Sequence, residues 1–149
     1  MNTKIKLCLA KEIITLRHVV LRQGKPISSC HFDGDDYENT YHFGAFNEDK
    51  VIGCVSLIKK DHQNFNYKNT YQLRGMAVLP YYRNKKIGLQ ILTHAANFLK
   101  KKNIELIWCN VRIRAIPFYR KNNFLSKGTE FNIPDVGPHV LMFKALYNA

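Results

Sequence analysis

The sequence predicts an α/β fold built on a mixed sheet. Three observations carry this prediction: segments in which polar and apolar residues alternate, one long segment with apolar residues at helical spacing (86–102), and a nearly all-apolar segment close behind it (104–111). A strand as apolar as 104–111 is expected where a sheet is covered on both faces. At 149 residues, 46% of them hydrophobic, the chain suits one domain with a substantial core. We therefore expect a single domain over residues 1–149.

The predicted elements follow in order along the chain. The first half predicts a strand at 4–9, a helix at 11–23 ended by Gly24 and Pro26, a polar acidic loop at 28–40, and a hairpin of strands 41–46 and 51–59 with the four-residue connection 47–50. The second half predicts a loop at 62–69, a strand at 71–79 stopped by Pro80, the long helix 86–102, the strand 104–111, a short helix at 115–121, and strands at 124–131 and 139–145.

Composition excludes several classes of protein. No apolar run approaches the roughly 20 residues that a membrane span needs, and charges interrupt the N-terminal segment, which excludes a signal-peptide core. We therefore expect a cytoplasmic protein. The four cysteines lie far apart with no CxxC pair, and the six histidines lack ligand spacing. The sequence thus predicts neither a disulfide framework nor a metal site.

The net charge of +12 raises the possibility of a nucleic-acid partner. Compositional bias explains the charge equally simply, because 16 of the 23 basic residues are lysine. The charge is also uneven: four of the 11 acidic residues lie in the loop 33–38, while basic residues gather at 83–86, 100–102 and 112–121. A DNA-binding surface does not need such an acidic segment, so the sequence does not favour nucleic acid.

A basic turn, Arg83-Asn-Lys-Lys-Ile-Gly88, opens the long helix. Unpaired backbone N–H groups and the positive end of the helix dipole make such a turn suitable for a phosphate group. Arg83 and Lys85 or Lys86 would add charge-assisted hydrogen bonds, and Gly88 would allow close approach of the backbone. A solvated basic loop that caps a helix explains these six residues equally well.

A second motif follows the apolar strand: Asn110-Val-Arg-Ile-Arg-Ala-Ile-Pro-Phe-Tyr-Arg-Lys-Asn-Asn-Phe124. Together with the basic turn, it resembles the GNAT superfamily of acetyl-CoA-dependent N-acetyltransferases, with a Q/R-x-x-G-x-G/A loop after a strand and a later N-x-x-A-x-x-F-Y-x-K-x-G-F signature. The residues that match are Arg83, Gly88, Asn110, Ala115, Phe118, Tyr119, Lys121 and Phe124. Lys86 stands where the first loop glycine usually lies, and lysine suits that position if the residue there needs no positive φ. Asn123 replaces the later glycine, and Asn also tolerates a left-handed helix end.

The resemblance implies a single-domain GNAT-like fold. Its sheet is mixed, mostly antiparallel and six- to seven-stranded, with a central splayed parallel pair flanked by helices. It also implies acetyl-CoA as co-substrate and no metal. Pantetheine would pair with the strand backbone at Met76, Ala77 and Val78, where a strand amide would act as an oxyanion donor. The diphosphate would bind at Arg83, Asn84, Lys85, Lys86, Ile87 and Gly88, and Asn110 and Phe118 would also belong to the cofactor site.

Tyr119 is the candidate catalytic residue that the resemblance implies. It would lie near the sulfur and protonate the departing thiolate as a general acid. A core aromatic residue beside Phe118 is the alternative, and the matching motif favours the catalytic role. Asn110 would hold the cofactor or substrate side at the strand end, or it caps the short helix that follows.

The acceptor side is less defined. Many members of the family carry a Glu base on the strand before the loop, where this sequence has Arg74. Arg74 either binds a carboxylate or phosphate of the substrate or points outward into an ion pair. Asp33, Asp35 and Asp36 could receive a cationic amine or relay its proton through water, although a surface loop with Asp-Gly turn chemistry explains them slightly better. His31 and His139 could act as bases, but nothing local singles out either.

The function predicted is transfer of an acetyl group from acetyl-CoA to a primary amine by direct attack, with Tyr119 as general acid. Two alternatives remain: a non-catalytic acyl-CoA-binding or sensing module, and a basic nucleic-acid-binding protein. The expected partners are acetyl-CoA and an amine-bearing acceptor, with no membrane, and the chain is expected to be a monomer or a homodimer.

Overall fold

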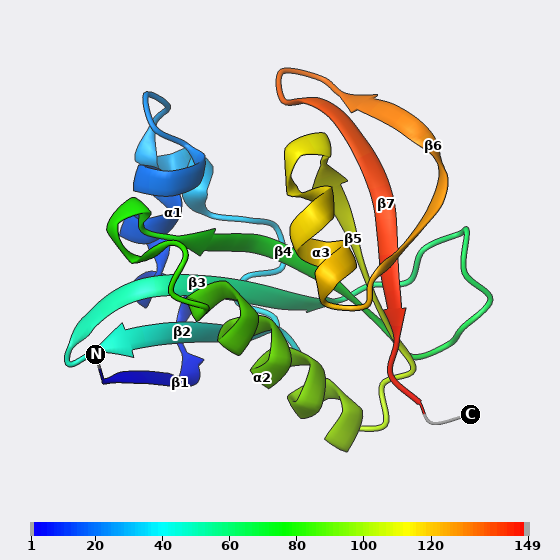
Figure 1. Cartoon of the computed structure of the whole chain (residues 1–149), viewed down its shortest axis with the longest axis horizontal. Coiled ribbons are helices and arrows are strands. Elements are labelled where there is room, and N and C mark those ends of the chain that lie inside the picture. Colours follow the sequence, from blue (N-terminus) through cyan, green and yellow to red (C-terminus); the bar gives the residue numbers. More distant parts are fainter. Residues whose placement is uncertain (1, 148–149) are drawn as a thin grey trace. The chain divides into compact units, whose positions relative to one another are not determined.

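The computed structural model describes residues 2–147. Seven strands form one sheet in the order β1-β2-β3-β4-β5-β7-β6 (Figure 1). The strands are β1 Thr3–Cys8, β2 Tyr41–Asn47, β3 Lys50–Lys59, β4 Thr70–Val78, β5 Leu106–Arg112, β6 Leu125–Ile133 and β7 Gly137–Ala145. The α-helices are α1 Ile14–Leu21, α2 Ile87–Lys101 and α3 Ile116–Lys121. The predicted α/β fold with a mixed sheet is confirmed.

The sheet combines one parallel pair with antiparallel pairs. β4 and β5 run parallel, pairing Thr70–Gln72 with Leu106–Trp108. The pairs β1–β2, β2–β3, β5–β7 and β6–β7 are antiparallel. The predicted mostly antiparallel sheet with a parallel pair is therefore confirmed, whereas its splaying stays a prediction. None of the helices between residues 2 and 147 is long and apolar enough to cross a membrane.

The chain divides into two compact units. Unit 1 comprises Met1–Lys59 and Leu73–Phe98, and unit 2 comprises Lys60–Gln72 and Leu99–Ala149. Strand β4 contributes its first residues to unit 2 and the rest to unit 1. That residues 1–149 form a single domain stays a prediction.

In unit 1, α1 and α2 cover opposite faces of β2 and β3. The Phe43 ring on β2 packs edge-on against Phe98 of α2, with 5.2 Å between ring centroids. Gly53 on β3 lets α2 approach closely, because an added Cβ would lie 2.8 Å from Ile91 Cδ1. The next residue, Cys54, points to the other face and joins Leu16 of α1 in a buried cluster. Neighbouring residues of β3 thus serve two different helices, as the alternation of a strand requires.

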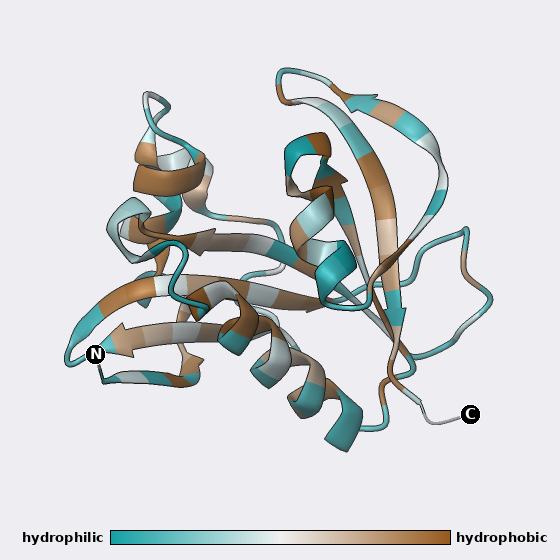
Figure 2. Ribbon diagram, viewed as in Figure 1, coloured by the Kyte–Doolittle hydropathy of each residue, from teal (hydrophilic) through white to brown (hydrophobic). Residues whose placement is uncertain are grey.

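Hydropathy along α2 agrees with this packing. Ile87, Ile91 and Leu99 are almost completely buried. The helix ends in the hydrophilic, exposed residues Lys100 and Lys101, and Figure 2 shows its end in teal. Two basic residues at the C-terminal end of a helix are also favoured by its dipole.

Unit 2 has its own core around Trp108 of β5. Trp108 is buried with Leu106 and Leu141, and its indole N–H donates to the Lys60 carbonyl oxygen at 3.0 Å. The His62 ring, from the loop before β4, packs edge-on against the Trp108 ring at 4.7 Å. Burial, followed by the positive charge of Lys60, lowers the pKa of His62. The contact with Trp108 gives His62 a structural role in the core of unit 2.

Most elements begin or end within two residues of the prediction, and three differences have a clear structural cause. The hairpin connection is two residues rather than four, because Asn47 and Lys50 pair with each other and Glu48 takes a positive φ of 57°. The first predicted helix is split into a 3-10 turn at Ala10–Glu12 and α1. Strand β6 begins at Leu125 rather than at Phe124. Phe124 belongs to the end of α3, because its ring is buried and its N–H donates to the Tyr119 carbonyl oxygen.

Candidate active site

The basic turn lies in unit 1, between a 3-10 turn at Pro80–Tyr82 and α2. All four residues from Arg83 to Lys86 are exposed. The backbone is left-handed at Asn84 (φ 61°) and at Lys86 (φ 64°). The condition under which lysine suits the glycine position is therefore not met, because Lys86 does take a positive φ. Such a backbone costs a side-chain-bearing residue roughly 1–2 kcal/mol.

The turn leaves backbone donors without partners. Within residues 2–147, the N–H groups of 84–88 have no hydrogen-bond acceptor, whereas the Lys86 carbonyl oxygen accepts the first helical bond from the Gln90 N–H at 3.1 Å. The first N–H groups of an α-helix cannot find a partner inside it. The Arg83 side chain is held back, since its Nε donates to the Val78 carbonyl oxygen at 3.2 Å. Lys85 and Lys86 are thus the exposed cations beside a row of free N–H groups.

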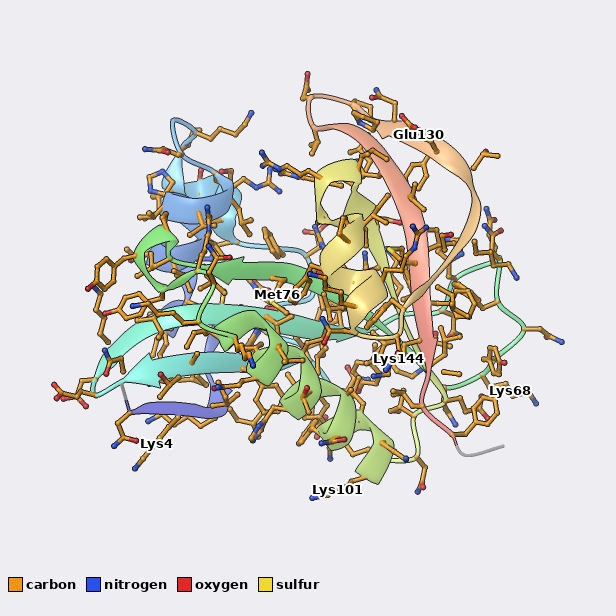
Figure 3. All side chains as sticks on the ribbon, in the orientation of Figure 1. Lys4, Lys68, Met76, Lys101, Glu130 and Lys144 are labelled. Atoms are coloured by element: carbon orange, nitrogen blue, oxygen red, sulfur yellow. The ribbon has the colours of Figure 1, made fainter. Side chains whose placement is uncertain are left out.

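The strand before this turn is anchored in the core of unit 1. Ala77 is buried in a cluster with Ile13 and Leu16, while Met76 and Val78 are partly buried; Figure 3 labels Met76 on β4. The Leu79 N–H donates to the Ile52 carbonyl oxygen at 2.9 Å, which ties the strand end to β3. A rigid strand therefore leads into the basic turn.

In unit 2, α3 places Tyr119 in an aromatic and thiol environment. The Tyr119 ring packs edge-on against Phe118 and Phe124, with centroid distances of 5.1 and 5.3 Å. Only 7% of the residue is exposed, and its hydroxyl makes no hydrogen bond within residues 2–147. Burial, followed by the neighbouring Cys109 thiol, raises the pKa of Tyr119 well above its usual value. The phenol therefore keeps its proton at neutral pH.

Asn110 lies on β5, opposite Leu141 of β7, and is the only exposed residue in the strand pattern of β5. It does not cap the short helix, because the N-cap residues of the two turns that follow are Arg112 and Ala115 and neither makes a side-chain cap bond. The capping alternative for Asn110 is therefore wrong. Its amide makes no hydrogen bond within the described part of the chain.

Arg74 of β4 is half-buried in unit 1 and stacks on an aromatic ring. Its guanidinium carbon lies 4.6 Å from the centroid of the Phe32 ring. Arg74 makes no ion pair within residues 2–147, so the outward ion pair considered for it is not formed. Burial, followed by repulsion from Arg17, lowers the pKa of the Arg74 guanidinium.

The acidic loop splits into one buried and several exposed carboxylates. Asp33 and Asp36 are exposed, whereas Asp35 is buried and forms an ion pair with Arg17. Burial alone would raise the pKa of Asp35, but hydrogen bonds from Arg17 and from the Phe32 N–H outweigh it and lower the pKa. The Asp35 carboxylate is thus already occupied by protein donors. Asp33 and Asp36 are exposed and accessible to a cationic group, as is Glu38 in the same loop.

The two candidate histidines differ in accessibility. His31 is exposed, whereas His139 is buried and its Nδ1 lies 2.8 Å from the Gly137 carbonyl oxygen. That contact assigns the proton of His139 to Nδ1. No group of three potential metal ligands exists within residues 2–147.

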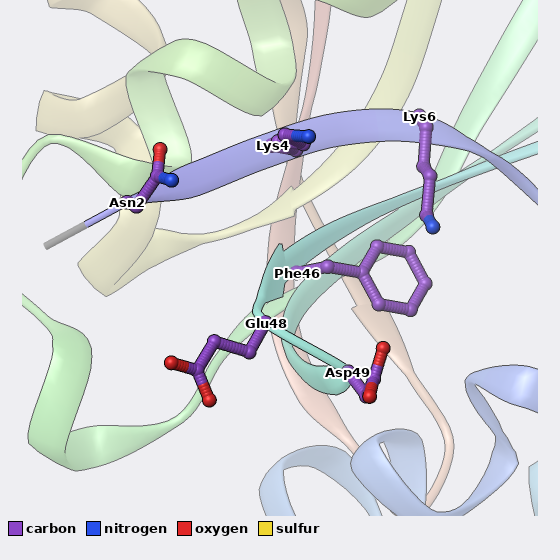
Figure 4. A pocket seen from close by; sticks show the side chains of 6 residues that line it. All are labelled: Asn2, Lys4, Lys6, Phe46, Glu48 and Asp49. Carbon is purple, nitrogen blue, oxygen red and sulfur yellow. The ribbon is translucent and has the colours of Figure 1, made fainter.

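A shallow hollow lies elsewhere in unit 1, beside β1 (Figure 4). It is lined by Asn2, Lys4, Lys6, Phe46, Glu48 and Asp49. In Figure 4 the Lys6 side chain points toward the Phe46 ring, and its Nζ lies 4.5 Å from the ring centroid. None of the predicted site residues lines this hollow.

Residues 13–124 match the model of the Acetyltransferase (GNAT) family, which covers both the basic turn and α3. The chain belongs to the GNAT acetyltransferase family. It is therefore an acyltransferase enzyme. It is 30% identical over 143 residues to the uncharacterized N-acetyltransferase YitI of Bacillus subtilis (strain 168), covering 96% of each chain.

Solved structures show the same fold. An acetyltransferase of the GNAT family from Staphylococcus aureus Mu50 has a TM-score of 0.76 and 21% identity, over 98% of this chain and 100% of the other. An aminoglycoside 6′-N-acetyltransferase in complex with coenzyme A has a TM-score of 0.79 and 12% identity, over 98% of both chains. The expected GNAT fold is confirmed.

This GNAT chain departs from the family pattern at two glycine positions, and both residues are left-handed. Asn123 has a φ of 69° at the end of α3, which confirms that asparagine takes the place of glycine there. Lys86 has a φ of 64° at the start of α2. The backbone conformation is thus kept at both positions although neither residue is glycine.

Sequence reasoning missed the network behind the acidic loop. Arg17 is completely buried and binds Asp35, the Cys30 carbonyl oxygen and Ser56. One signal was present: Arg17 follows Ile13 by four residues and precedes Leu21 by four, so it lies on the apolar face of its helix. A charged residue at a core position of a helix indicates a buried partner.

Proposed function

We propose that this GNAT enzyme transfers an acetyl group from acetyl-CoA to a primary amine by direct attack, with Tyr119 as general acid. The observation that carries the proposal is the Tyr119 phenol: the residue is buried, it is protonated at neutral pH, and its hydroxyl has no hydrogen-bond partner within residues 2–147. A buried phenol with a free O–H is suited to donate a proton to a leaving group.

The reaction balances as follows. The amine nitrogen forms a bond to the thioester carbonyl carbon, the C–S bond breaks, and the sulfur takes the phenolic proton of Tyr119. Water returns a proton to Tyr119, and the amine releases one to solvent. A thiol has an ordinary pKa near 8.5, below that of the Tyr119 phenol, so this proton transfer is uphill by itself. Return of a proton to the phenolate completes the step.

The basic turn of unit 1 suits the diphosphate of coenzyme A. The free N–H groups of 84–88 and the exposed Lys85 and Lys86 would bind its oxygens, as helix N-termini bind phosphate elsewhere. Met76, Ala77 and Val78 are proposed to pair with pantetheine through their backbone. Asn110, with its exposed and unbonded amide, is proposed to bind the cofactor or the substrate, and Phe118 stays a candidate cofactor contact.

On the acceptor side, Arg74, Asp33 and Asp36 stay candidates for substrate binding. A substrate role for Asp35 also stays a prediction, although its carboxylate is held by Arg17. Arg74 cannot serve as a base, so the proton of the amine must leave by another route. The cytoplasmic location and the monomeric or dimeric state stay predictions.

Two measurements test the proposal. Thermal unfolding is followed with and without acetyl-CoA; a ligand at 100 times its Kd adds about 2.7 kcal/mol of stability. Release of free CoA is then measured with a panel of primary amines for wild type and Tyr119→Phe, and the variant is expected to lose roughly 100-fold or more in kcat.

The outcomes separate the alternatives. Stabilisation by acetyl-CoA without acetyl transfer to any amine would support the non-catalytic binding module. Affinity for DNA or RNA that falls with salt, with no stabilisation by acetyl-CoA up to millimolar concentration, would support the nucleic-acid-binding protein. Equal kcat in wild type and Tyr119→Phe would remove Tyr119 from the mechanism.

A further inference from the structure

Three arginines of unit 1 surround one aromatic ring. The guanidinium carbons of Arg17, Arg74 and Arg22 lie 3.9, 4.6 and 5.7 Å from the centroid of the Phe32 ring. Arg17 belongs to α1, Arg74 belongs to β4, and Arg22 is the C-cap residue of α1. One cation stacked on a ring is common, but three like charges around the same ring repel one another.

Only one of the three arginines has its charge paired. Arg17 binds Asp35 through two hydrogen bonds, of 2.6 and 3.0 Å, and is closed to solvent. Arg22 and Arg74 are partly buried and make no ion pair within residues 2–147. Partial burial without a counter-ion is unfavourable for a charge, and it is the state that a bound anion would relieve.

The surrounding groups indicate the charge of that anion. Burial lowers the pKa of Arg74 most, and the charges of Arg17 and Arg22 lower it further, whereas the carboxylates of Asp35 and Asp33 raise it. Three cations against two carboxylates leave a formal charge of +1, which a single negative charge would balance. A carboxylate has this charge and matches the planar fork of a guanidinium.

The backbone that follows Arg74 lies close to the Phe32 ring. Gly75 follows Arg74 with a φ of 64°, and an added Cβ there would lie 3.0 Å from Phe32 Cε2 and 3.6 Å from Arg17 Nε. That Nε is buried and has no hydrogen-bond partner within the described residues. The Phe32 ring and the Arg17 side chain thus pack close to Gly75, the residue that follows Arg74.

We infer that Arg74 and Arg22, held against Phe32, form a subsite for a carboxylate group of the acceptor, so that the enzyme acetylates amines that also carry a carboxylate. This inference rests on the proposed acetyl transfer and adds the class of acceptor. The exposed Asp33 and Asp36 suit the ammonium form of the same molecule as it arrives. Arg74 thus takes a substrate-binding role at the position where many members of the family carry a Glu base.

Matched pairs of acceptors test the inference. One member of each pair is an amino acid whose amine is at the α, β, γ or δ position. The other member is the amine of the same chain length that lacks the carboxylate. For at least one pair we expect kcat/KM to be roughly 10-fold or more higher for the carboxylate-bearing member, the usual effect of a charged hydrogen bond. Arg74→Gln should bring this ratio to about 1, and Arg22→Gln should lower it.

Three further variants complete the design. Arg74→Lys keeps the charge but loses the planar fork, so it should keep part of the ratio. Lys101→Gln removes one exposed charge at the end of α2, where Figure 3 shows Lys101 pointing away from the ribbon, and should keep the whole ratio. Phe32→Leu removes the ring that orders the arginines and should lower the ratio. Stabilisation by acetyl-CoA serves as the check that each variant is folded.

Two results would overturn the inference. A ratio near 1 for every pair in the wild-type enzyme, with acetyl transfer intact, would remove the subsite while leaving the proposed function standing. A ratio above 10 that survives both Arg74→Gln and Arg22→Gln would place carboxylate recognition elsewhere. Absence of both transfer and stabilisation by acetyl-CoA would overturn the proposed function, and this inference with it.

Discussion

Arg17 and Asp35 form a two-pronged ion pair inside unit 1. Arg17 Nη1 lies 2.6 Å from Asp35 Oδ2, and Nη2 lies 3.0 Å from Oδ1. Arg17 also donates to Ser56 Oγ at 2.7 Å, and Ser56 Oγ lies 2.7 Å from His42 Nδ1. His42 Nε2 in turn lies 2.9 Å from the Asp35 carbonyl oxygen. The network therefore fixes the acidic loop to α1 and to the β2–β3 hairpin.

Removing the carboxylate of this pair should strongly destabilise the protein. Asp35→Asn leaves the Arg17 charge buried and unpaired, and breaking one partner of a buried pair costs about 3–5 kcal/mol. Urea unfolding at pH 7 measures the change in free energy. Asp36→Asn, one residue away and exposed, is the matched control and should change it by less than about 0.5 kcal/mol. Equal effects of the two substitutions would contradict the role given to Asp35.

Stability should fall in acid because of the same carboxylate. The pKa of Asp35 is lowered in the folded state from its ordinary value of 3.8. A lowered pKa gives stability that is fully present above about pH 3.8 and is lost as the pH falls through the folded-state value. The unfolding temperature measured from pH 6 to pH 3 should therefore drop less steeply in Asp35→Asn than in wild type. Parallel curves would exclude Asp35 as a source of acid sensitivity.

Lys86→Gly should stabilise the protein without its ligand. Lys86 has a φ of 64°, which glycine adopts at no steric cost. The relief of roughly 1–2 kcal/mol exceeds the entropy that glycine adds to the unfolded chain, about 0.4–1 kcal/mol. Lys85→Gly, in the same exposed turn but outside the left-handed region, should be destabilising instead. Thermal unfolding of both variants decides the matter, and a loss of stability in Lys86→Gly would contradict the strain argument.

The cysteines should react slowly in the native protein. Burial raises the pKa of Cys8 to about 11 and that of Cys54 to about 12, and it also raises the pKa of Cys109. Cys30 is completely buried. At pH 8 only about one Cys8 side chain in a thousand is then a thiolate. A thiol reagent should detect four free cysteines after unfolding and almost none within minutes before it. Rapid reaction of one thiol in the native protein would contradict this prediction and would show that the thiol becomes exposed to solvent.

Local patterns predicted most of the fold, because each depends on neighbouring residues. The helical spacing of apolar residues located α2, and the nearly continuous burial of β2 and β3 reflects the helices that cover both faces. The errors lie at the ends of elements, where a single backbone pairing or hydrogen bond sets the boundary. The hairpin loop is shorter than predicted because Asn47 and Lys50 pair across it. Phe124 belongs to the end of α3 because its N–H binds the Tyr119 carbonyl oxygen.

The sequence by itself determined the family, the basic turn and the candidate acid Tyr119, since these depend on short motifs. Only the tertiary structure decided which charges are paired. It pairs Asp35 with Arg17, whereas Arg74 and Arg22 lie around Phe32 without a counter-ion among residues 2–147. Arg17 and Asp35 are 18 residues apart and Phe32 and Arg74 are 42 apart, so no local spacing reports their contact. The pairing of charges depends on the geometry of the folded chain. The unpaired arginines are the basis for the inferred carboxylate of the acceptor.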